Sequence, residues 1–193
     1  MRKLYVIAGC NGAGKTTASY TILPEILDCK EFVNADEIAR GLSPFQPERA
    51  GIQAGRLMLT RIKTLFESGE NFAFETTLST KSYVNFLKGA KEKGYQITLL
   101  FFWLNSVELA ISRVKTRVKE GGHNIPENVI RRRYEGGLTN FFELYILIVD
   151  NWMLINNSGE PYEIIAEGSS DGIEIVNNEL WENLKSEYYG KQQ

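Results

Sequence analysis

A run of eight residues near the start of the chain limits the possible folds more than any other feature: Gly9-Cys10-Asn11-Gly12-Ala13-Gly14-Lys15-Thr16. The run matches G-x-x-x-x-G-K-[ST] at every fixed position. A strand-like segment, residues 3–8, comes before it, and a helix is expected after it, from Lys15 to about Leu27. A strand and a helix on its two sides are the setting in which this pattern forms a phosphate-binding loop.

The residue types of this loop indicate how it would hold a phosphate chain. Glycines let backbone N–H groups turn toward phosphate oxygens, and the helix that follows presents its positive end. Lys15 would reach the β- and γ-phosphates, and the Thr16 hydroxyl would ligate Mg²⁺. Cys10 would contribute only its backbone. The predicted nucleotide-binding residues are Gly9, Asn11, Gly12, Ala13, Gly14, Lys15, Thr16 and Thr17.

Strand-like and helical segments alternate along the rest of the chain. Strands are expected at residues 32–35, 72–74, 96–104 and 153–156. Helices are expected from Pro47 to Ser68, at 81–93, from Ser106 to Gly121-Gly122, from Pro126 to Gly136-Gly137, and at 179–189. In the first of these helices Gly55, Leu59, Ile62 and Phe66 repeat at helical spacing. Residues 162–166 and 173–176 are expected to pair as a small antiparallel addition. The alternation predicts an α/β fold of three layers, a mostly parallel five-stranded sheet with helices on both faces.

Length and composition restrict the class of protein. A chain of 193 residues is predicted to form a single domain, residues 1–193, in which the two helices of about residues 106–136 make a hinged hairpin. The net charge of −2 gives no basic surface for nucleic acid or anionic lipid. No apolar run has the roughly 20 residues of a membrane span, and the start of the chain shows no signal peptide. Two cysteines, Cys10 and Cys29, without C-x-x-C spacing fit a reducing compartment, so a cytoplasmic protein is expected.

Polar residues follow two of the predicted strands, where the carboxyl ends of parallel strands meet at a ligand crevice. Asp36 could accept a proton from an attacking hydroxyl or hold Mg²⁺ through water, although it could also be only the N-cap of a helix that begins at Glu37. Glu75, Thr76 and Thr77 could recognise a substrate, or could only bond locally within a turn.

Helical angles separate the arginines of the predicted hairpin. Arg133 falls in the apolar stripe of its helix, and Arg117 borders the apolar stripe of the preceding helix, so both are expected to face an anionic ligand. Arg113, Arg131 and Arg132 are expected to be ordinary surface charges or salt-bridge partners. His123, the sole histidine, is either a hinge or substrate contact or simply a polar turn residue. The three tryptophans are expected in the core.

Together, the phosphate-binding loop, Asn34-Ala35-Asp36, Glu75-Thr76-Thr77 and the arginine-bearing hairpin resemble the zeta toxin family of P-loop kinases, in particular its single-domain branch. The resemblance covers roughly residues 1 to 158. It implies a fold like that of nucleoside-monophosphate kinases, ATP and Mg²⁺ as cofactors, and phosphorylation of a hydroxyl on UDP-N-acetylglucosamine or a related nucleotide sugar. One departure is that better-known toxins carry an aspartate where this chain has Asn34.

The resemblance also implies roles for residues of this chain. Asp36 is the implied general base, Lys15 and Thr16 hold phosphate and metal, Glu75 lies in the acceptor site, and Arg117 and Arg133 neutralise the transferring group. An antitoxin protein is a possible partner. The residues leave two alternatives open: a nucleotide-dependent switch or ATPase that recruits a protein, and a housekeeping nucleotide or cofactor kinase. The chain contains no N-K-x-D run of the kind usual in GTP-specific proteins.

Overall fold

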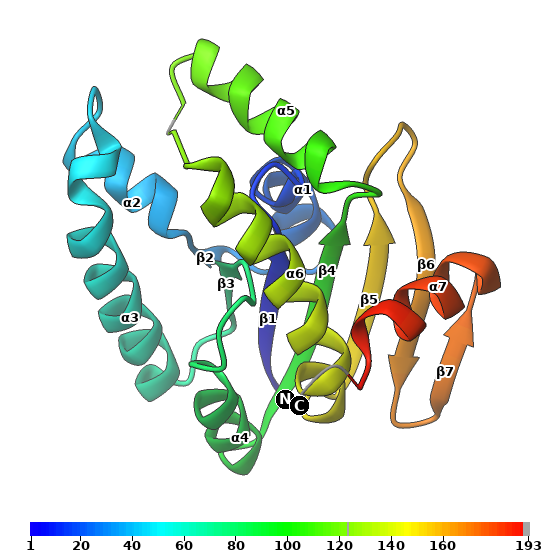
Figure 1. Cartoon of the computed structure of the whole chain (residues 1–193). Helices are drawn as coiled ribbons and strands as arrows, with labels where there is room; N and C mark the ends of the chain where they lie inside the picture. The colour runs from blue at the N-terminus through cyan, green and yellow to red at the C-terminus, as the bar shows by residue number, and fades with distance from the viewer. Residues whose placement is uncertain (123, 191–193) are drawn as a thin grey trace.

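The computed structural model describes residues 1–122 and 124–190, and a seven-stranded sheet forms its centre (Figure 1). In spatial order the strands are β2 (Glu31–Val33), β3 (Phe72–Thr76), β1 (Arg2–Gly9), β4 (Tyr95–Trp103), β5 (Asn151–Asn156), β6 (Glu163–Ser169) and β7 (Gly172–Ile175). The first five strands are parallel to one another. Strand β6 pairs antiparallel with β5, and β7 pairs antiparallel with β6. The predicted parallel sheet and its antiparallel addition are therefore confirmed, and the two form one continuous sheet.

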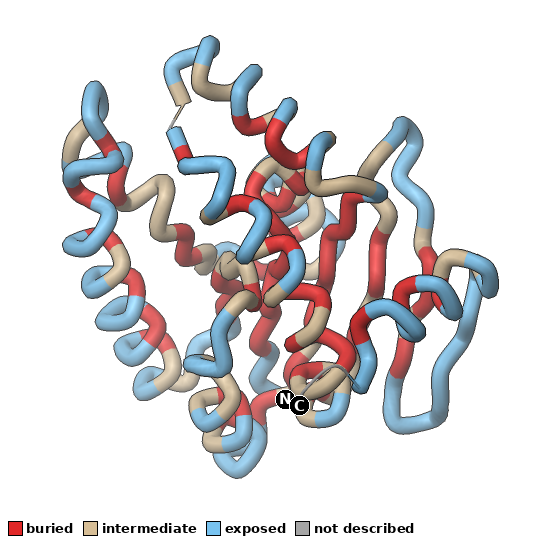
Figure 2. Tube along the Cα trace, in the orientation of Figure 1, coloured by how far each residue is buried: buried red, intermediate tan, exposed pale blue. Residues whose placement is uncertain are grey.

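Helices connect the parallel strands and cover the sheet. They are α1 (Lys15–Thr21), α2 (Ala35–Leu42), α3 (Gly51–Ser68), α4 (Val84–Glu92), α5 (Val107–Lys119), α6 (Glu127–Glu143) and α7 (Asn178–Tyr188). Three short turns of other helix types complete the described elements: η1 (Ile22–Ile26), η2 (Pro47–Ala50) and η3 (Tyr145–Leu147). The middle strands β1 and β4 are buried along most of their length, as Figure 2 shows. Burial on both faces explains why these strands read as continuous apolar runs. None of the described helices is both long enough and apolar enough to cross a bilayer.

Tryptophan and phenylalanine rings fill the core between α6, α7 and the sheet. The rings of Trp152 and Trp181 stack with centroids 5.5 Å apart, and Phe141 of α6 meets Trp152 edge-on at 5.6 Å. Trp103 donates a 3.0 Å hydrogen bond from its ring nitrogen to the hydroxyl of Tyr134, which is buried with it. All three tryptophans are buried, which confirms the expectation from the sequence.

The predicted end of one helix is wrong. Helix α6 does not stop at Gly136-Gly137 but continues to Glu143. The two glycines lie where the helix passes close to the loop after β3, and a Cβ on Gly137 would be 2.7 Å from the backbone oxygen of Thr77. Glycine here permits a close approach between backbones, and the buried residues on both sides of it hold the helix together.

Two smaller predictions also need correction. Helix α3 buries Ala54, Met58, Ile62 and Leu65, whereas Leu59 of the predicted stripe is 56% exposed. The helix after the phosphate-binding loop changes from α to π geometry at Ile22, two residues before Pro24. Proline has no backbone N–H for the regular ladder, which accounts for the change.

Candidate active site

The phosphate-binding loop connects β1 to α1, and Asn157 contacts it from the end of β5. The side-chain nitrogen of Asn157 donates a 2.8 Å hydrogen bond to the carbonyl oxygen of Ala13. Gly14 lies beside this amide with φ at 80°, and a Cβ there would be 2.5 Å from the same nitrogen. The left-handed backbone favours glycine at position 14, and a Cβ there would also displace the Asn157 amide from its contact with Ala13.

Lys15 and Thr16 both face Glu75, near the carboxyl end of β3. The Nζ atom of Lys15 donates a 2.9 Å hydrogen bond to the carbonyl of Cys10 and lies 3.5 Å from Oε1 of Glu75. The hydroxyl of Thr16 donates a 2.7 Å hydrogen bond to Oε2 of the same carboxylate. Lys15 is only 5% exposed, so its charge needs a partner of opposite sign. Glu75 supplies that partner from β3, whereas Lys15 lies at the start of α1.

Asn34 joins this group to the start of α2. Its Oδ1 accepts hydrogen bonds from the backbone N–H groups of Asp36 at 2.8 Å and Glu37 at 3.4 Å, so Asn34 is the N-cap. Its Nδ2 donates to Oε2 of Glu75 at 2.9 Å and to the hydroxyl of Thr16 at 3.2 Å. The alternative in which Asp36 caps this helix is therefore wrong. Strand β2 ends one residue before Asn34, and Asp36 lies in the first helical turn.

Arginines from two helices approach the same place. One guanidinium nitrogen of Arg117, on α5, lies 3.8 Å from Oδ2 of Asp36. Arg133, on α6, faces inward as its helical angle predicts, and it donates a 3.0 Å hydrogen bond to Oδ1 of Asn11. Burial lowers the pKa of the Arg133 guanidinium from its ordinary value, and the carboxylate of Asp36 opposes that shift. Two cations therefore lie beside Asp36 and the loop.

Arg113 does not match its expected role as a surface charge. Its two terminal nitrogens donate hydrogen bonds to the carbonyls of Asn157 at 2.8 Å and Ser158 at 3.0 Å. Arg131, in contrast, forms an exposed ion pair with Glu108 at 2.8 Å, as expected. Sequence reasoning missed Arg113, Asn157 and Ser158. The last two follow β5, so the rule that found Asp36 and Glu75 at strand ends could also have found them.

These groups surround one cavity of about 260 Å³. Its lining consists of Asn11, Gly12, Gly14, Lys15, Thr16, Thr17, Asp36, Glu75, Arg113 and Arg117. The predicted residues that come together here thus include most of the loop, the two carboxylates and Arg117. A cavity with a lysine, two arginines and a helix N-terminus is suited to a polyanion.

Thr76 and Thr77 make other contacts, and Arg133 reaches Asn11 without lining the cavity. The hydroxyl of Thr76 accepts a hydrogen bond from the backbone N–H of Leu78 at 3.1 Å, and that of Thr77 pairs with Ser79 at 3.0 Å. These are the local turn contacts of the alternative interpretation, and neither threonine lines the cavity. His123 lies outside the described residues.

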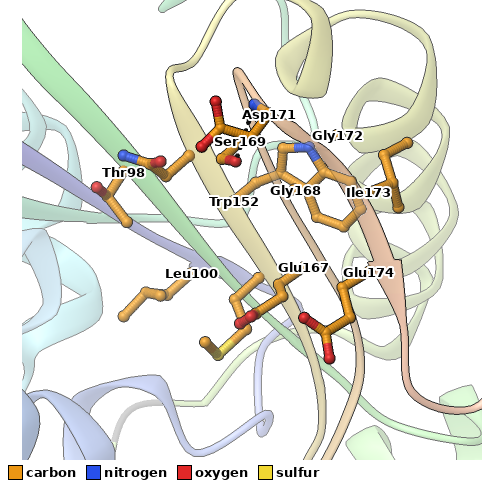
Figure 3. Close-up of a pocket in the computed structure, with 12 residues that line it drawn as sticks. Thr98, Leu100, Trp152, Glu167, Gly168, Ser169, Asp171, Gly172, Ile173 and Glu174 are labelled. Atoms are coloured by element: carbon orange, nitrogen blue, oxygen red, sulfur yellow. Dashed lines mark hydrogen bonds between the residues drawn. The ribbon is translucent and has the colours of Figure 1, made fainter.

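Two further hollows lie apart from the loop. One, of about 430 Å³, lies over β4 to β7, and Figure 3 shows the carboxylates of Glu167, Asp171 and Glu174 around it. Those negative charges disfavour a phosphate there. The other, of about 740 Å³, lies between α3 and the start of α4, and Ala35, the residue before Asp36, is part of its lining. Its lining is largely apolar, with Met58, Phe66 and Phe86 among the contributing side chains.

The oxygen ligands beside the loop fit a magnesium ion. The Thr16 hydroxyl and the Glu75 carboxylate are the hard oxygen donors that Mg²⁺ prefers, and they already lie in contact at 2.7 Å. Within residues 1–122 and 124–190, no cluster of three or more His, Cys, Asp or Glu side chains could hold a metal by itself. A metal with few protein ligands is usual where phosphate oxygens complete the coordination.

Comparison with known proteins places this geometry in a family. The model of the Zeta toxin family matches residues 2–160. An uncharacterized protein of Haemophilus influenzae is 33% identical over 132 residues, which is 68% of this chain and 92% of that protein.

Solved structures show the same fold at low sequence identity. A chain in the crystal structure of AvrRxo1-ORF1:-ORF2 with ATP aligns with all of this chain at a TM-score of 0.79 and 18% identity, and the alignment spans 66% of that longer chain. The PezAT toxin-antitoxin system of Streptococcus pneumoniae gives 0.66 at 15% identity, over 100% of this chain and 80% of that chain. Shikimate kinase from Acinetobacter baumannii gives 0.50 at 17% identity, over 100% and 96%. The predicted P-loop kinase fold is confirmed, and the family match over residues 2–160 shows that this chain belongs to the zeta toxin family.

Proposed function

We propose that this protein is an ATP-dependent kinase that transfers the γ-phosphate of ATP to a hydroxyl group of a small molecule. The observation that carries the proposal is the cavity in which Lys15, Thr16, Glu75, Asp36 and Arg117 converge from different elements. A phosphate-binding loop alone is common to many nucleotide-binding proteins. A carboxylate beside it, faced by arginines, is what transfer to a hydroxyl requires.

Each side chain has a separate role in this reaction. The loop amides and Lys15 would bind the β- and γ-phosphates. Asp36 would orient the acceptor hydroxyl and take its proton as the acceptor oxygen bonds to the γ-phosphorus and the bond to the β–γ bridging oxygen breaks. ADP leaves with that bridging oxygen. Arg117 and Arg133 would neutralise the transferring group, since both lie within reach of Asp36 or the loop.

A bound Mg²⁺ would be held by Thr16, with Glu75 in contact directly or through water. When bound, the ion supplies neutralisation of phosphate charge. Glu75 would also border the acceptor, because it lines the same cavity as Asp36.

For the acceptor we propose a nucleotide sugar such as UDP-N-acetylglucosamine, as the family resemblance implies. The hollow along α3 supports an acceptor with a sizeable apolar or aromatic part, since it has about 740 Å³ and its lining includes Ala35, the residue before Asp36. A nucleotide sugar would place its reactive hydroxyl at Asp36 and its base in that hollow.

We further propose that residues 1–193 act as one cytoplasmic domain and that α5 and the first part of α6, the predicted hairpin of about residues 106–136, close over the nucleotide. An antitoxin is the proposed protein partner. This proposal is supported by the similarity of the fold to a chain of the PezAT structure, which is described as a toxin-antitoxin system.

The test uses purified protein with γ-labelled ATP and a panel of nucleotide sugars, nucleotides and NAD. The expected result is label in one small molecule, lost in Asp36→Asn and in Lys15→Ala, while the melting temperature of each variant stays within a few degrees of the parent. Release of free phosphate only, unchanged by Asp36→Asn, would indicate a nucleotide switch instead.

A further inference from the structure

The Asn34 side chain connects the backbone at Asp36, the proposed base, with Glu75 and Thr16. Asn34 is 5% exposed, and the two ends of its amide make different contacts. The oxygen end accepts from the N–H groups of Asp36 and Glu37, and the nitrogen end donates to Glu75 and Thr16. We propose that Asn34 is a positioning residue that sets the distance between Asp36 and the Thr16–Glu75 pair. This inference rests on the proposed function.

The orientation of the amide follows from chemistry. A carboxylate accepts hydrogen bonds and a backbone N–H donates them, so the amide nitrogen must face Glu75 and the oxygen must face α2. The reversed amide would place an oxygen against the carboxylate at 2.9 Å and a nitrogen against the N–H of Asp36 at 2.8 Å. Both contacts would be repulsive. The side chain therefore has one stable arrangement, and its geometry defines the start of α2.

The consequence concerns how precisely the acceptor is held. Asp36 is two residues from Asn34, in the first turn of the helix that Asn34 caps. Glu75 is on β3, which pairs with β2 as far as Val33, and the Asn34 amide extends this connection to the first turn of α2. Displacements of about 1 Å can slow an enzymatic reaction by about a hundredfold. Loss of the Asn34 donor should therefore reduce turnover more than it reduces nucleotide binding, which the loop and Lys15 provide.

In this chain an amide makes both contacts. A serine at position 34 would keep the N-cap but would be too short to reach Glu75. Asn34→Ser therefore removes the donor and leaves α2 capped.

The chain contains a matched control on its far side. Asn177 caps α7 through its Oδ1, which accepts from the N–H of Leu180 at 3.1 Å, and its Nδ2 donates to Glu163 at 2.6 Å. Asn177 is likewise a capping amide that also binds a glutamate, although through an exposed contact, and none of these residues lines the nucleotide cavity. Asn177→Ser measures what the loss of such a contact does to the fold alone.

The experiment measures kcat, the KM for ATP and the melting temperature of Asn34→Ser and Asn177→Ser, with the acceptor that the labelling assay identifies. We expect Asn34→Ser to lower kcat at least about tenfold with the KM for ATP changed less than about threefold, and Asn177→Ser to leave both unchanged. Unaltered kcat in Asn34→Ser would overturn the inference. So would an equal loss of activity in the matched variants at 34 and 177. Absence of any labelled product with the parent protein would instead contradict the proposed kinase.

Discussion

Gly137 gives the strongest test of how α6 packs, because the same substitution should have opposite effects at two helical glycines. Replacing a glycine in a helix interior with alanine ordinarily stabilises the helix by about 1 kcal/mol. Gly89 of α4 has no atom within 4 Å of where its Cβ would lie, so Gly89→Ala should show this gain. At Gly137 the Cβ would lie 2.7 Å from the backbone oxygen of Thr77 and 3.7 Å from the ring of Phe101.

The magnitude at Gly137 follows from the contact. A backbone oxygen cannot rotate away as a flexible side chain can, so α6 or the loop after β3 must move. Such overpacking typically costs about 1–3 kcal/mol, which exceeds or cancels the gain in helix propensity of about 1 kcal/mol. The two variants should then differ in free energy of unfolding by about 1–3 kcal/mol, with Gly137→Ala the less stable.

Urea unfolding followed by tryptophan fluorescence measures this difference, and calorimetry gives it independently. For a domain of this size each 1 kcal/mol corresponds to about 2–4 °C in melting temperature. Gly89 is a suitable control for the chemistry of the substitution, because its Cβ would meet no neighbouring atom within 4 Å. Equal stabilisation by Gly137→Ala and Gly89→Ala would refute the close approach of α6 to Thr77.

Three other predictions concern the core, the thiols and the loop. Trp181→Ala should destabilise the protein by about 3–5 kcal/mol in urea unfolding, because it removes a buried ring stacked on a tryptophan of β5; a change below about 1 kcal/mol would contradict the packing of α7. Burial raises the pKa of the Cys10 thiol to about 11, and burial also raises that of Cys29, so near pH 8 both should be almost entirely protonated and react with a thiol reagent only after unfolding. Rapid modification of the native protein would count against this. Asn157→Ala should raise the KM for ATP severalfold by releasing the carbonyl of Ala13, whereas binding of ATP at the parental affinity in calorimetry would show that the loop needs no such contact.

Short-range sequence patterns are sufficient to predict the elements whose conformation depends on residues adjacent in the chain. The eight-residue loop is such a case, because glycine torsions and a following helix create a phosphate site from consecutive backbone atoms. The strand-end rule also located Asp36 and Glu75, since parallel strands must bring their carboxyl ends to one edge. Arg133 was placed from helical periodicity alone, and the fold class followed from the alternation of strands and helices.

Tertiary structure alone decided which polar groups contact one another. The pair Gly136-Gly137 predicted a helix end from local sequence alone. Helix α6 continues to Glu143, because the residues on its inner face are buried and Gly137 allows a close approach to Thr77. Similarly, the sequence offered Asp36 as the N-cap of α2, whereas the structure places Asn34 there and brings Glu75 of β3 to within 2.9 Å of its nitrogen. Asn157 and Ala13 lie 144 residues apart in sequence, so no local pattern could show their hydrogen bond. Local rules act through the torsions of adjacent residues, and contacts between distant residues depend on how the whole sheet is assembled.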